Sequence, residues 1–369
     1  MKIFGRKAAA GRGSARPFLV QGGARGVIGE WPASYEAQVR DAFLANPIAQ
    51  RAVRMIATSA ASAPMASDPP ELLALIQARS AAQDLIETAT SHLLMHGNAF
   101  IQVMTDEGGM ARELYALRPE RVSVEADAQG WPAAYCYTVN GRSQRLSAGD
   151  GSGRPQVIHI KQFSPLDDHL GLGCLGAAAG AVAIHNAATR WNKALLDNAA
   201  RPSGALVYDP GDGATMTPVQ FDRLKAEMEA AFQGAANAGR PMLLEGGLKW
   251  QALSLSPADM DFVGLKAAAA REIALAFGVP PMLLGLPGDN AYASYREANR
   301  ALWRQAVLPV VTTILGGIAE GLKGWWPGAT AWVDENRVSV LAEERYELWA
   351  AASAADFLNA EEKKVLVGM

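Results

Sequence analysis

The feature of the sequence that most constrains its fold is a long, alanine-rich helical pattern over residues 256–278. Ser256-Pro257-Ala258-Asp259 begins it with a cap and a first-turn proline, and Gly278 followed by Pro280 ends it. Apolar side chains recur at alternating spacings of three and four residues, as in a seam that packs against another helix. The seam consists of Met260, Val263, Ala267, Ala270, Ala274 and Phe277. Because a second apolar stripe runs beside it, we expect neighbours on two sides, in a ring of identical subunits or in a monomer core.

A second alanine-rich helix is predicted over 176–199, and a compact α/β insert separates the two helices. The insert's helix begins at Thr217-Pro218, where Gln220 completes a capping box. The strands predicted for the insert are 203–209, 240–246 and 248–255. The order helix, insert, helix predicts a paired-helix element that carries a small mixed subdomain.

A loop and a third long helix follow. Residues 282–294 are rich in glycine, proline, Asp and Asn, so they predict a loop. The helix is predicted from about Tyr295 to Glu320 with a kink at Pro309, which lacks an N–H group. Arg296, Arg300 and Arg304 are four residues apart and therefore share one face of it. This face is either solvated or a cationic surface that lines something acidic.

The first half of the chain predicts helices followed by strands. Asn46-Pro47 begins a helix that ends near Ser62, and Asp68-Pro69-Pro70-Glu71 is a capping-box pattern that begins a helix to about His96. The predicted strands are 99–104, 113–117, 121–125, 133–139 and 156–160. Their short, turn-rich connections predict an antiparallel meander, and the fold class is therefore α+β.

Composition excludes several classes of protein. With 369 residues, half of them apolar, and 19% charged residues, the chain has enough material for two or three packed domains. Two cysteines, Cys136 and Cys174, are too few for a disulfide framework. No run reaches the roughly 18 uncharged apolar residues of a membrane span. A net charge of −3 does not suit a protein that coats DNA. Residues 1–26 carry six basic residues and no acid, so they predict a flexible basic arm.

Two sequence motifs raise the possibility of an enzyme, and both are weak. Gly171, Gly173 and Gly176 have the G-x-G-x-x-G spacing of a dinucleotide site and open a helix. However, about ten residues separate the preceding strand from the first glycine, and no strand–helix alternation follows. His92 and His96 lie four residues apart on a helix, but the sequence offers no third ligand cluster. We therefore expect no metal, no cofactor and no catalytic residues.

Segments spread along the chain carry a family resemblance. They are NPIAQRAVRMIA (46–57), LLMHGNAFIQVMTDEGG (93–109), LYALRPERVSV (114–124), QVIHIKQFSPLDDHLGLGCLGAA (156–178), LLDNAARPSGALVYD (195–209), GRPMLLEGGLKWQALSLSPADMDFV (239–263) and REIALAFGVPPMLLGLPGDNAYASYREANRALWRQAVLPVV (271–311). In this order, over roughly residues 40 to 365, the chain resembles the portal proteins of long-tailed, siphovirus-type bacteriophages and of phage-derived gene transfer agents.

The resemblance implies a division of the chain. Residues 27–170 and the strand 331–340 would form the β-rich wing, 171–200 and 256–280 the two stem helices, 201–255 the clip, 281–294 the tunnel loop, 295–330 the tunnel helix and return, and 341–369 a short helical crown. The seam residues would then be stem contacts between subunits. The tunnel loop residues Leu286, Pro287, Gly288, Asp289 and Asn290, with Arg296, Arg300 and Arg304, would line a DNA channel. The loop holds no lysine or arginine, which argues against a strong grip on DNA.

The resemblance also implies the function and the partners. A ring of twelve subunits, assembled in the bacterial cytoplasm, would sit at one capsid vertex of a virion or virus-like particle. It would pass double-stranded DNA during packaging and ejection, and it would contact the large terminase, the neck adaptor and the major capsid protein, but no membrane. No enzymatic activity is implied. The alternatives are a dinucleotide-binding oxidoreductase that uses Gly171, Gly173 and Gly176, and a monomeric DNA-binding module that uses the arginine stripe.

Overall fold

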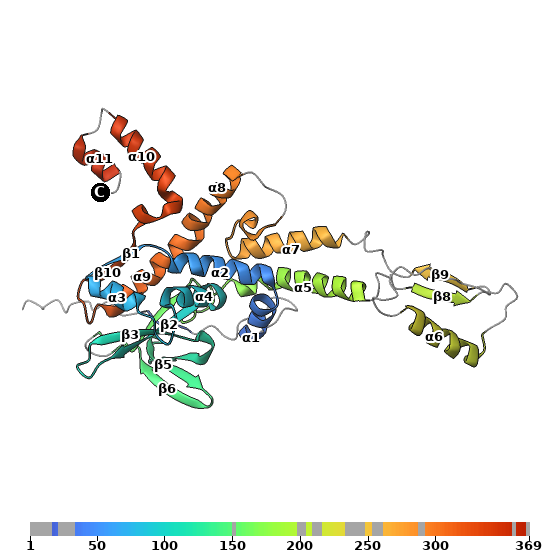
Figure 1. The fold of residues 1–369 in the computed structure, drawn as a ribbon. Coiled ribbons are helices and arrows are strands. Elements are labelled where there is room, and N and C mark those ends of the chain that lie inside the picture. Colours follow the sequence, from blue (N-terminus) through green and yellow to red (C-terminus); the bar gives the residue numbers. More distant parts are fainter. Residues whose placement is uncertain are drawn as a thin grey trace, which may run out of the picture. The chain divides into compact units, whose positions relative to one another are not determined.

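The computed structural model describes residues 17–20, 34–149, 153–197, 204–208, 216–232, 248–252, 261–286, 292–355 and 359–366 (Figure 1). They divide into two compact units that mix helices and sheets, as the predicted α+β class requires. The first unit falls within residues 1–26, 57–173 and 307–369, and the second within 27–56 and 174–306. Helix α2 (Pro47–Ala61) crosses the division between Ile56 and Ala57.

Two three-stranded antiparallel sheets form the strand-rich part of the first unit. One has the order β3-β2-β7 and the other β4-β5-β6. Their strands are β2 (Asn98–Thr105), β3 (Ala111–Leu117), β4 (Val122–Ala126), β5 (Pro132–Val139), β6 (Arg142–Ser147) and β7 (Val157–Lys161). The antiparallel prediction is confirmed, but a single meander is wrong, because β7 returns to pair with β2. Strand β6, whose side chains are mostly polar, was not predicted.

The core of this unit lies where the facing sides of the two sheets meet. The buried cluster consists of Phe100, Leu117, Tyr135, Leu146 and Val157. Phe100 stacks on His159 with ring centroids 4.2 Å apart, and Tyr135 meets both rings edge-on. Burial raises the pKa of Tyr135 to about 12. The cluster joins strands of both sheets, and its burial stabilises their packing.

Helix α9 (Leu308–Leu322) packs on the other side of β7. A Cβ atom at Gly317 would lie 2.7 Å from Ile160, and one at Gly321 would lie 2.5 Å from Ile158. The two glycines are one helical turn apart, so they form a flat strip on which the two isoleucines rest. Alternation along β7 therefore sends His159 to the inter-sheet core and its two neighbours to the helix.

The helix predicted from Asp68 to His96 is wrong, because the structure has two helices there. Helix α3 (Pro70–Gln77) and helix α4 (Leu85–His96) are separated by a turn in which Ala81 and Ala82 have φ values of +48° and +63°. The Asp84 carboxylate caps α4 by accepting the Glu87 N–H at 3.0 Å. Gln83 fixes the turn to β3, because its Oε1 accepts the Ala116 N–H at 2.9 Å.

The predicted cap Asp68 belongs instead to strand β1 (Met65–Asp68). This strand pairs antiparallel with β10 (Thr330–Val333). The predicted strand 331–340 is thus too long: after Val333 the chain forms two short 3₁₀ turns, Glu335–Arg337 and Ser339–Leu341. Helices α10 (Ala342–Ala354) and α11 (Ala360–Leu366) follow, in the region predicted to be helical.

The second unit holds the predicted helix–insert–helix order. Its elements in sequence are α1 (Tyr35–Gln38), the π-helical turn η1 (Val39–Leu44), α5 (Leu175–Asp197), β8 (Gly204–Tyr208), α6 (Pro218–Phe232), β9 (Leu248–Ala252), α7 (Phe262–Ala276), the 3₁₀ turn η4 (Pro281–Leu284), α8 (Tyr292–Leu302) and the π-helical turn η5 (Trp303–Val307). Strands β8 and β9 pair antiparallel, and the predicted capping box forms between Thr217 and Gln220. The predicted strand 240–246 lies outside the described residues.

Two boundaries in this unit differ from the sequence predictions. The described part of the helix predicted over 256–278 begins at Phe262, and Asp261 caps it by accepting the Gly264 N–H at 3.1 Å. Helix α8 begins at Tyr292, three residues before the predicted start. The 3₁₀ turn η4 also occupies the beginning of a segment predicted to lack regular structure.

Candidate functional site

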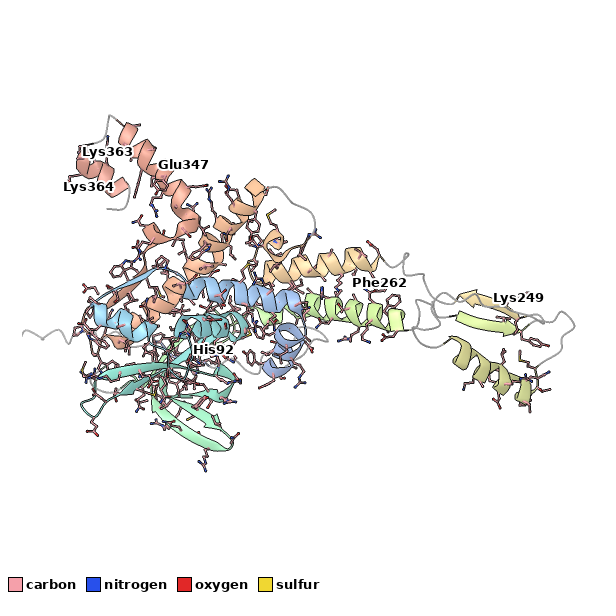
Figure 2. All side chains as sticks on the ribbon, in the orientation of Figure 1. His92, Lys249, Phe262, Glu347, Lys363 and Lys364 are labelled. Carbon is pink, nitrogen blue, oxygen red and sulfur yellow. The ribbon has the colours of Figure 1, made fainter. Side chains whose placement is uncertain are left out.

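Helices α5 and α7 pack side by side and run in opposite directions. Trp191, near the end of α5, stacks on Phe262 at the beginning of α7, with ring centroids 4.1 Å apart (Figure 2). Lys266, one turn further along α7, acts on His185, which lies earlier on α5. Contacts that move forward on one helix while moving backward on the other define an antiparallel pair. The insert that contains β8, α6 and β9 connects the end of α5 to the start of α7.

The predicted stem contacts divide between two environments on α7. Ala270, Ala274 and Phe277 are buried within the chain, each no more than 3% exposed, and Ala267 is half-buried. Val263 is 83% exposed. Met260 lies outside the described residues. Two further large apolar residues of α7 lie off the seam and are exposed: Leu265 is 44% exposed and Leu275 is 79% exposed. The buried residues hold the subunit together, and the exposed ones are available to another chain.

A buried polar cluster joins α5 to the beginning of α2. The Asn46 carboxamide oxygen caps α2 by accepting the N–H groups of Ile48 and Ala49 at 3.0 and 3.1 Å. Its Nδ2 donates to Asn186 Oδ1 at 2.9 Å and lies 3.2 Å from His185 Nδ1. Asn186 in turn donates to the Asp41 carbonyl in η1 at 2.9 Å. Burial, followed by the positive charge of Lys266, lowers the pKa of His185 and so disfavours its charged form.

The three arginines of the predicted stripe lie in the helical run as expected, but they differ in exposure to solvent. Arg296 and Arg304 are exposed, whereas the Arg300 side chain is 14% exposed and pairs with Glu297 at 2.9 Å. The predicted kink at Pro309 takes the form of the π-helical turn η5 just before it. Proline has no N–H to give to the carbonyl of Gln305, and a wider turn accommodates that lost bond. Arg304 lies in this turn.

The structure describes only part of the predicted tunnel loop. Leu286 is half-buried after the left-handed Gly285. Pro287, Gly288, Asp289 and Asn290 lie outside the described residues.

Gly171 and Gly173 pack closely against the backbone at the end of α4. A Cβ atom at Gly171 would lie 2.2 Å from the Gly97 carbonyl, and one at Gly173 would lie 2.4 Å from the Met95 carbonyl. The Asn98 side chain completes this junction: it accepts the Gly171 N–H at 2.7 Å and donates to the Gly171 carbonyl at 3.1 Å. The backbone of α4 thus fills the space that a pyrophosphate would need, which argues against the dinucleotide alternative.

The histidines of α4 belong to the interior of the first unit. His96 is buried and its Nδ1 lies 3.0 Å from Asn98 Nδ2. Burial, and then the charge of Arg118, lowers the pKa of His92 to about 4 (Figure 2). Burial lowers the pKa of His159 to about 3, with smaller contributions from Lys161, His96 and His169. Among the described residues no group of three or more His, Cys, Asp or Glu side chains is arranged to hold a metal ion.

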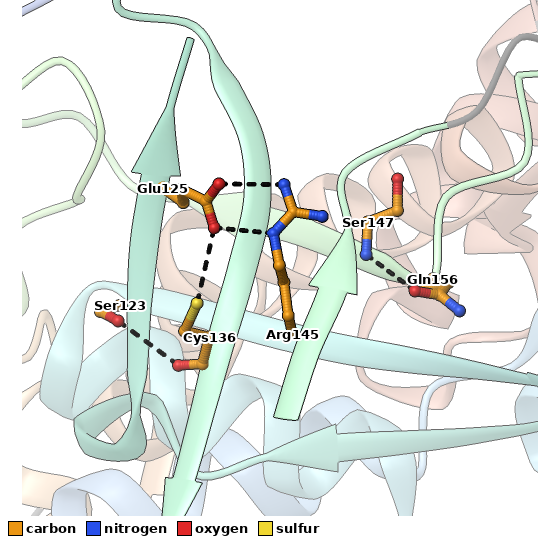
Figure 3. A network of polar contacts seen from close by, with 6 residues as sticks. All are labelled: Ser123, Glu125, Cys136, Arg145, Ser147 and Gln156. Atoms are coloured by element: carbon orange, nitrogen blue, oxygen red, sulfur yellow. Dashed lines mark hydrogen bonds and ion pairs between the residues drawn. The ribbon is translucent and has the colours of Figure 1, made fainter. Parts of the chain in front are cut away.

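A polar network covers the exposed face of the β4-β5-β6 sheet (Figure 3). Arg145 on β6 forms two hydrogen bonds with Glu125 on β4, at 2.8 and 2.9 Å. Cys136 on β5, between them, directs its Sγ toward the same carboxylate at 3.8 Å. Hydrogen bonds from Arg145 lower the pKa of Glu125. The network is a solvated salt bridge across three strands. This salt bridge was not predicted, because the strand that carries Arg145 was not predicted.

One helical run in the described part of the chain, Ser294–Leu322, is long and apolar enough to cross a membrane by length and composition. Core helices of soluble proteins meet the same criterion. The apolar side chains of α9 within it, among them Val311, Ile314 and Ile318, are fully buried in the first unit. Core packing therefore accounts for the apolar side chains in the α9 part of the run.

Comparison with known proteins places this architecture in a family. Residues 47–368 match the family model described as phage portal protein. The chain belongs to the phage portal protein family and is a portal subunit.

Three relatives illustrate the similarity. A Rickettsia bellii protein is 37% identical over 346 residues, covering 89% of this chain and 88% of the relative. The probable portal protein of Streptomyces phage phiC31 is 26% identical over 275 residues, covering 72% of this chain and 59% of the relative. A chain in the neck of a native gene transfer agent particle, determined with C12 symmetry, is 47% identical with a TM-score of 0.71. That match covers 92% of this chain and 94% of the solved one.

Proposed function

We propose that this chain forms a twelve-membered ring at one capsid vertex of a phage or gene transfer agent particle, where it is the head-tail connector. The observation that carries the proposal is the 47% identity, over 92% of the chain, to a chain in a particle neck of C12 symmetry. The fold supports it, because α7 keeps one apolar face for its own subunit and presents Val263, Leu265 and Leu275 to solvent. The ring is a structural conduit and has no catalytic step of its own.

The division into parts is also a proposal. Helices α5 and α7 are the stem, the insert 201–255 is the clip, and the strand-rich first unit is the wing with a short crown after residue 341. In this arrangement the tunnel loop, and α8 with Arg296, Arg300 and Arg304, line the channel for double-stranded DNA. The clip contacts the large terminase and then the neck adaptor, and the wing meets the major capsid protein.

The ring is tested by weighing and imaging the purified full-length protein. Twelve copies of the 39.0-kDa chain weigh about 470 kDa, which mass photometry separates clearly from a monomer. Negative-stain images should then show rings with a central hole. A single 39.0-kDa species at every concentration, in the presence and absence of the capsid protein, would contradict the proposal.

The channel is tested in an assembled packaging system. The double variant Arg296→Glu, Arg304→Glu should form rings of unchanged mass. It should package less DNA than wild type, because the DNA phosphates would then meet carboxylates in the channel. Arg142→Glu on the exposed β6 strand changes a charge outside the proposed channel and is the matched control. Equal DNA content in both variants would show that α8 does not face DNA.

A further inference from the structure

Helix α10 carries buried hydrogen-bond donors that have no acceptor. They are Nε and Nη1 of Arg345 and Nε1 of Trp349, and none of the three has a hydrogen-bond partner in the described part of the chain. In native proteins nearly every buried N–H group is paired, because an unpaired one has lost its bonds to water without replacement. Three such donors within about one turn of helix therefore call for an acceptor from outside this chain.

The donors lie in a small aromatic cluster. Arg345 and Trp349 are four residues apart and share one face of α10. The Arg345 guanidinium carbon lies 5.4 Å from the centre of the Trp349 ring and 5.9 Å from that of Tyr346, and the two rings meet edge-on. The rings attract the positive charge and order the guanidinium. They offer none of the oxygen acceptors that its N–H groups need.

Two large apolar side chains flank this row. At about 100° per residue, Leu348 lies to one side of Arg345 and Trp349, and Tyr346 lies to the other. Leu348 is 42% exposed and Tyr346 is 63% exposed, whereas Arg345 and Trp349 are half-buried. We call these four residues the α10 donor site. It combines buried donors with an apolar rim that is open to solvent, and Arg, Trp and Tyr are the residue types enriched at the centres of protein interfaces.

We propose that the α10 donor site binds a carboxylate side chain of another protein, an Asp or Glu that is flanked by apolar residues. All three unpaired groups are donors, and two of them belong to a cation, so the missing partner is an anionic acceptor. The planar guanidinium matches a carboxylate in geometry and charge. Tyr346 and Leu348 would then cover the apolar neighbours of that carboxylate. The proposal does not depend on the ring.

The charges of α10 favour a protein over DNA as the occupant. The helix contains three glutamates and one arginine. A duplex presents a row of phosphates and needs several cations to neutralise them. Glu343 and Glu347 are exposed and stand two residues from Arg345, so they lie on the other side of α10 (Figure 2). A single inserted carboxylate therefore meets Arg345 and avoids both glutamates, whereas a polyanion would meet them.

Two matched peptides test the site on the purified full-length protein. Acetyl-Leu-Glu-Leu-amide is compared with its Gln counterpart by saturation-transfer NMR, observed on the peptide methyl groups. The Glu peptide should bind about tenfold more tightly, because hydrogen bonds to a charged group are stronger than those to a neutral amide. Arg345→Met removes the guanidinium donors and should abolish this preference. Arg337→Met is the matched control, since it removes an exposed arginine in the 3₁₀ turn Glu335–Arg337. It should keep the preference.

Equal binding of the two peptides to wild type, or an unchanged preference in Arg345→Met, would overturn the proposal. A short DNA duplex that binds through Arg345 in place of the Glu peptide would also overturn it. The melting temperature separates binding from a role in the fold. Arg345→Met should leave that temperature unchanged or raise it, because two buried donors no longer lack acceptors. A fall of several degrees would assign Arg345 to the fold and contradict the docking site. Ring mass is measured separately, so none of these results bears on the proposed assembly.

Discussion

The junction around Gly171 and the α5–α7 pair differ in how they pack and in how much apolar surface they leave exposed. At the junction, glycine backbones from two segments touch, and the Asn98 side chain satisfies both the N–H and the carbonyl of Gly171. In the helix pair, contacts come from small side chains and one aromatic stack, and the large apolar residues Val263 and Leu275 of α7 stay exposed. The contacts of the junction are all made within the subunit, whereas α7 leaves apolar side chains exposed that another subunit can contact. This contrast separates residues that determine stability from residues that determine assembly.

The largest effect is expected from Gly171→Val. Its Cβ atom would lie 2.2 Å from the Gly97 carbonyl and 2.7 Å from the Gln162 nitrogen, both backbone atoms that cannot rotate away. We expect a loss of about 4 kcal/mol or more in the free energy of unfolding, measured by urea denaturation. Gly176→Ala is the control, since a Cβ atom there meets nothing within 4 Å and lies in α5. Equal stability of Gly171→Val and wild type would show that the junction is not close-packed.

The next effect is the pH dependence of the free energy of unfolding, to which His92 of the first unit contributes. The folded-state pKa of His92 is about 4 against an ordinary value of 6.5, so the unfolded chain binds the proton more readily. The stabilisation is complete above pH 6.5 and is lost progressively as the pH falls toward 4, by about 3 kcal/mol in total. Denaturation midpoints measured across this range should fall less steeply for His92→Leu than for wild type. A variant at an exposed site, Asn336→Ala, should keep the wild-type slope, and identical slopes for all three proteins would refute the assignment.

A smaller pair of effects compares two consecutive residues of α7. Ala274 is fully buried and Leu275 is 79% exposed. Ala274→Leu overpacks the helix pair and should destabilise the monomer by about 1–3 kcal/mol. Leu275→Ser should change monomer stability by less than about 0.5 kcal/mol and should reduce ring formation. Thermal melts of the monomer measure its stability, and mass photometry measures ring formation. If Leu275→Ser destabilised the monomer and Ala274→Leu only reduced ring formation, the assignment of these two residues to the interior and the surface would be wrong.

The smallest effect is expected at the network on the exposed sheet. Arg145→Ala removes both hydrogen bonds to Glu125 (Figure 3). Because both side chains are well exposed to water, the loss in the free energy of unfolding should be close to the resolution of a urea titration. Raising the salt concentration should shrink the difference between variant and wild type further. A loss several times larger would mean that the face is covered in the subunit.

Capping signals predicted much of the helical structure and also explain its main error. Thr217 with Gln220 forms the predicted box, and Asn46 caps α2. The structure puts the cap of α4 at Asp84, which has Glu87 at the third following position, and not at the predicted Asp68. Local sequence cannot rank the two, because Asp68 is drawn into a strand by β10, far away in the chain. Tertiary pairing decided the outcome.

The order of the elements of the candidate site was predictable from the sequence, but the burial of their side chains was not. The positions of α5, α7 and the arginine stripe follow from periodicity, which is a local property. Which face of α7 is covered depends on α5, and periodicity alone gave both stripes equal standing. The glycines at 171 and 173 have the spacing of a phosphate loop, and only the approach of Gly97 shows that they serve backbone packing. Asn98 had no signal of its own, since a single asparagine after a glycine also reads as a turn.

The β1–β10 pairing has a consequence for synthesis on the ribosome. Met65 faces Val333, so the two strands are separated by more than 260 residues of chain. Strand β1 emerges early and has no hydrogen-bonding partner in β10 until more than 260 further residues have been translated. Residues 174–306, the larger part of the second unit, are made during that interval. The β1–β10 sheet of the first unit therefore forms only after this part of the second unit has left the ribosome.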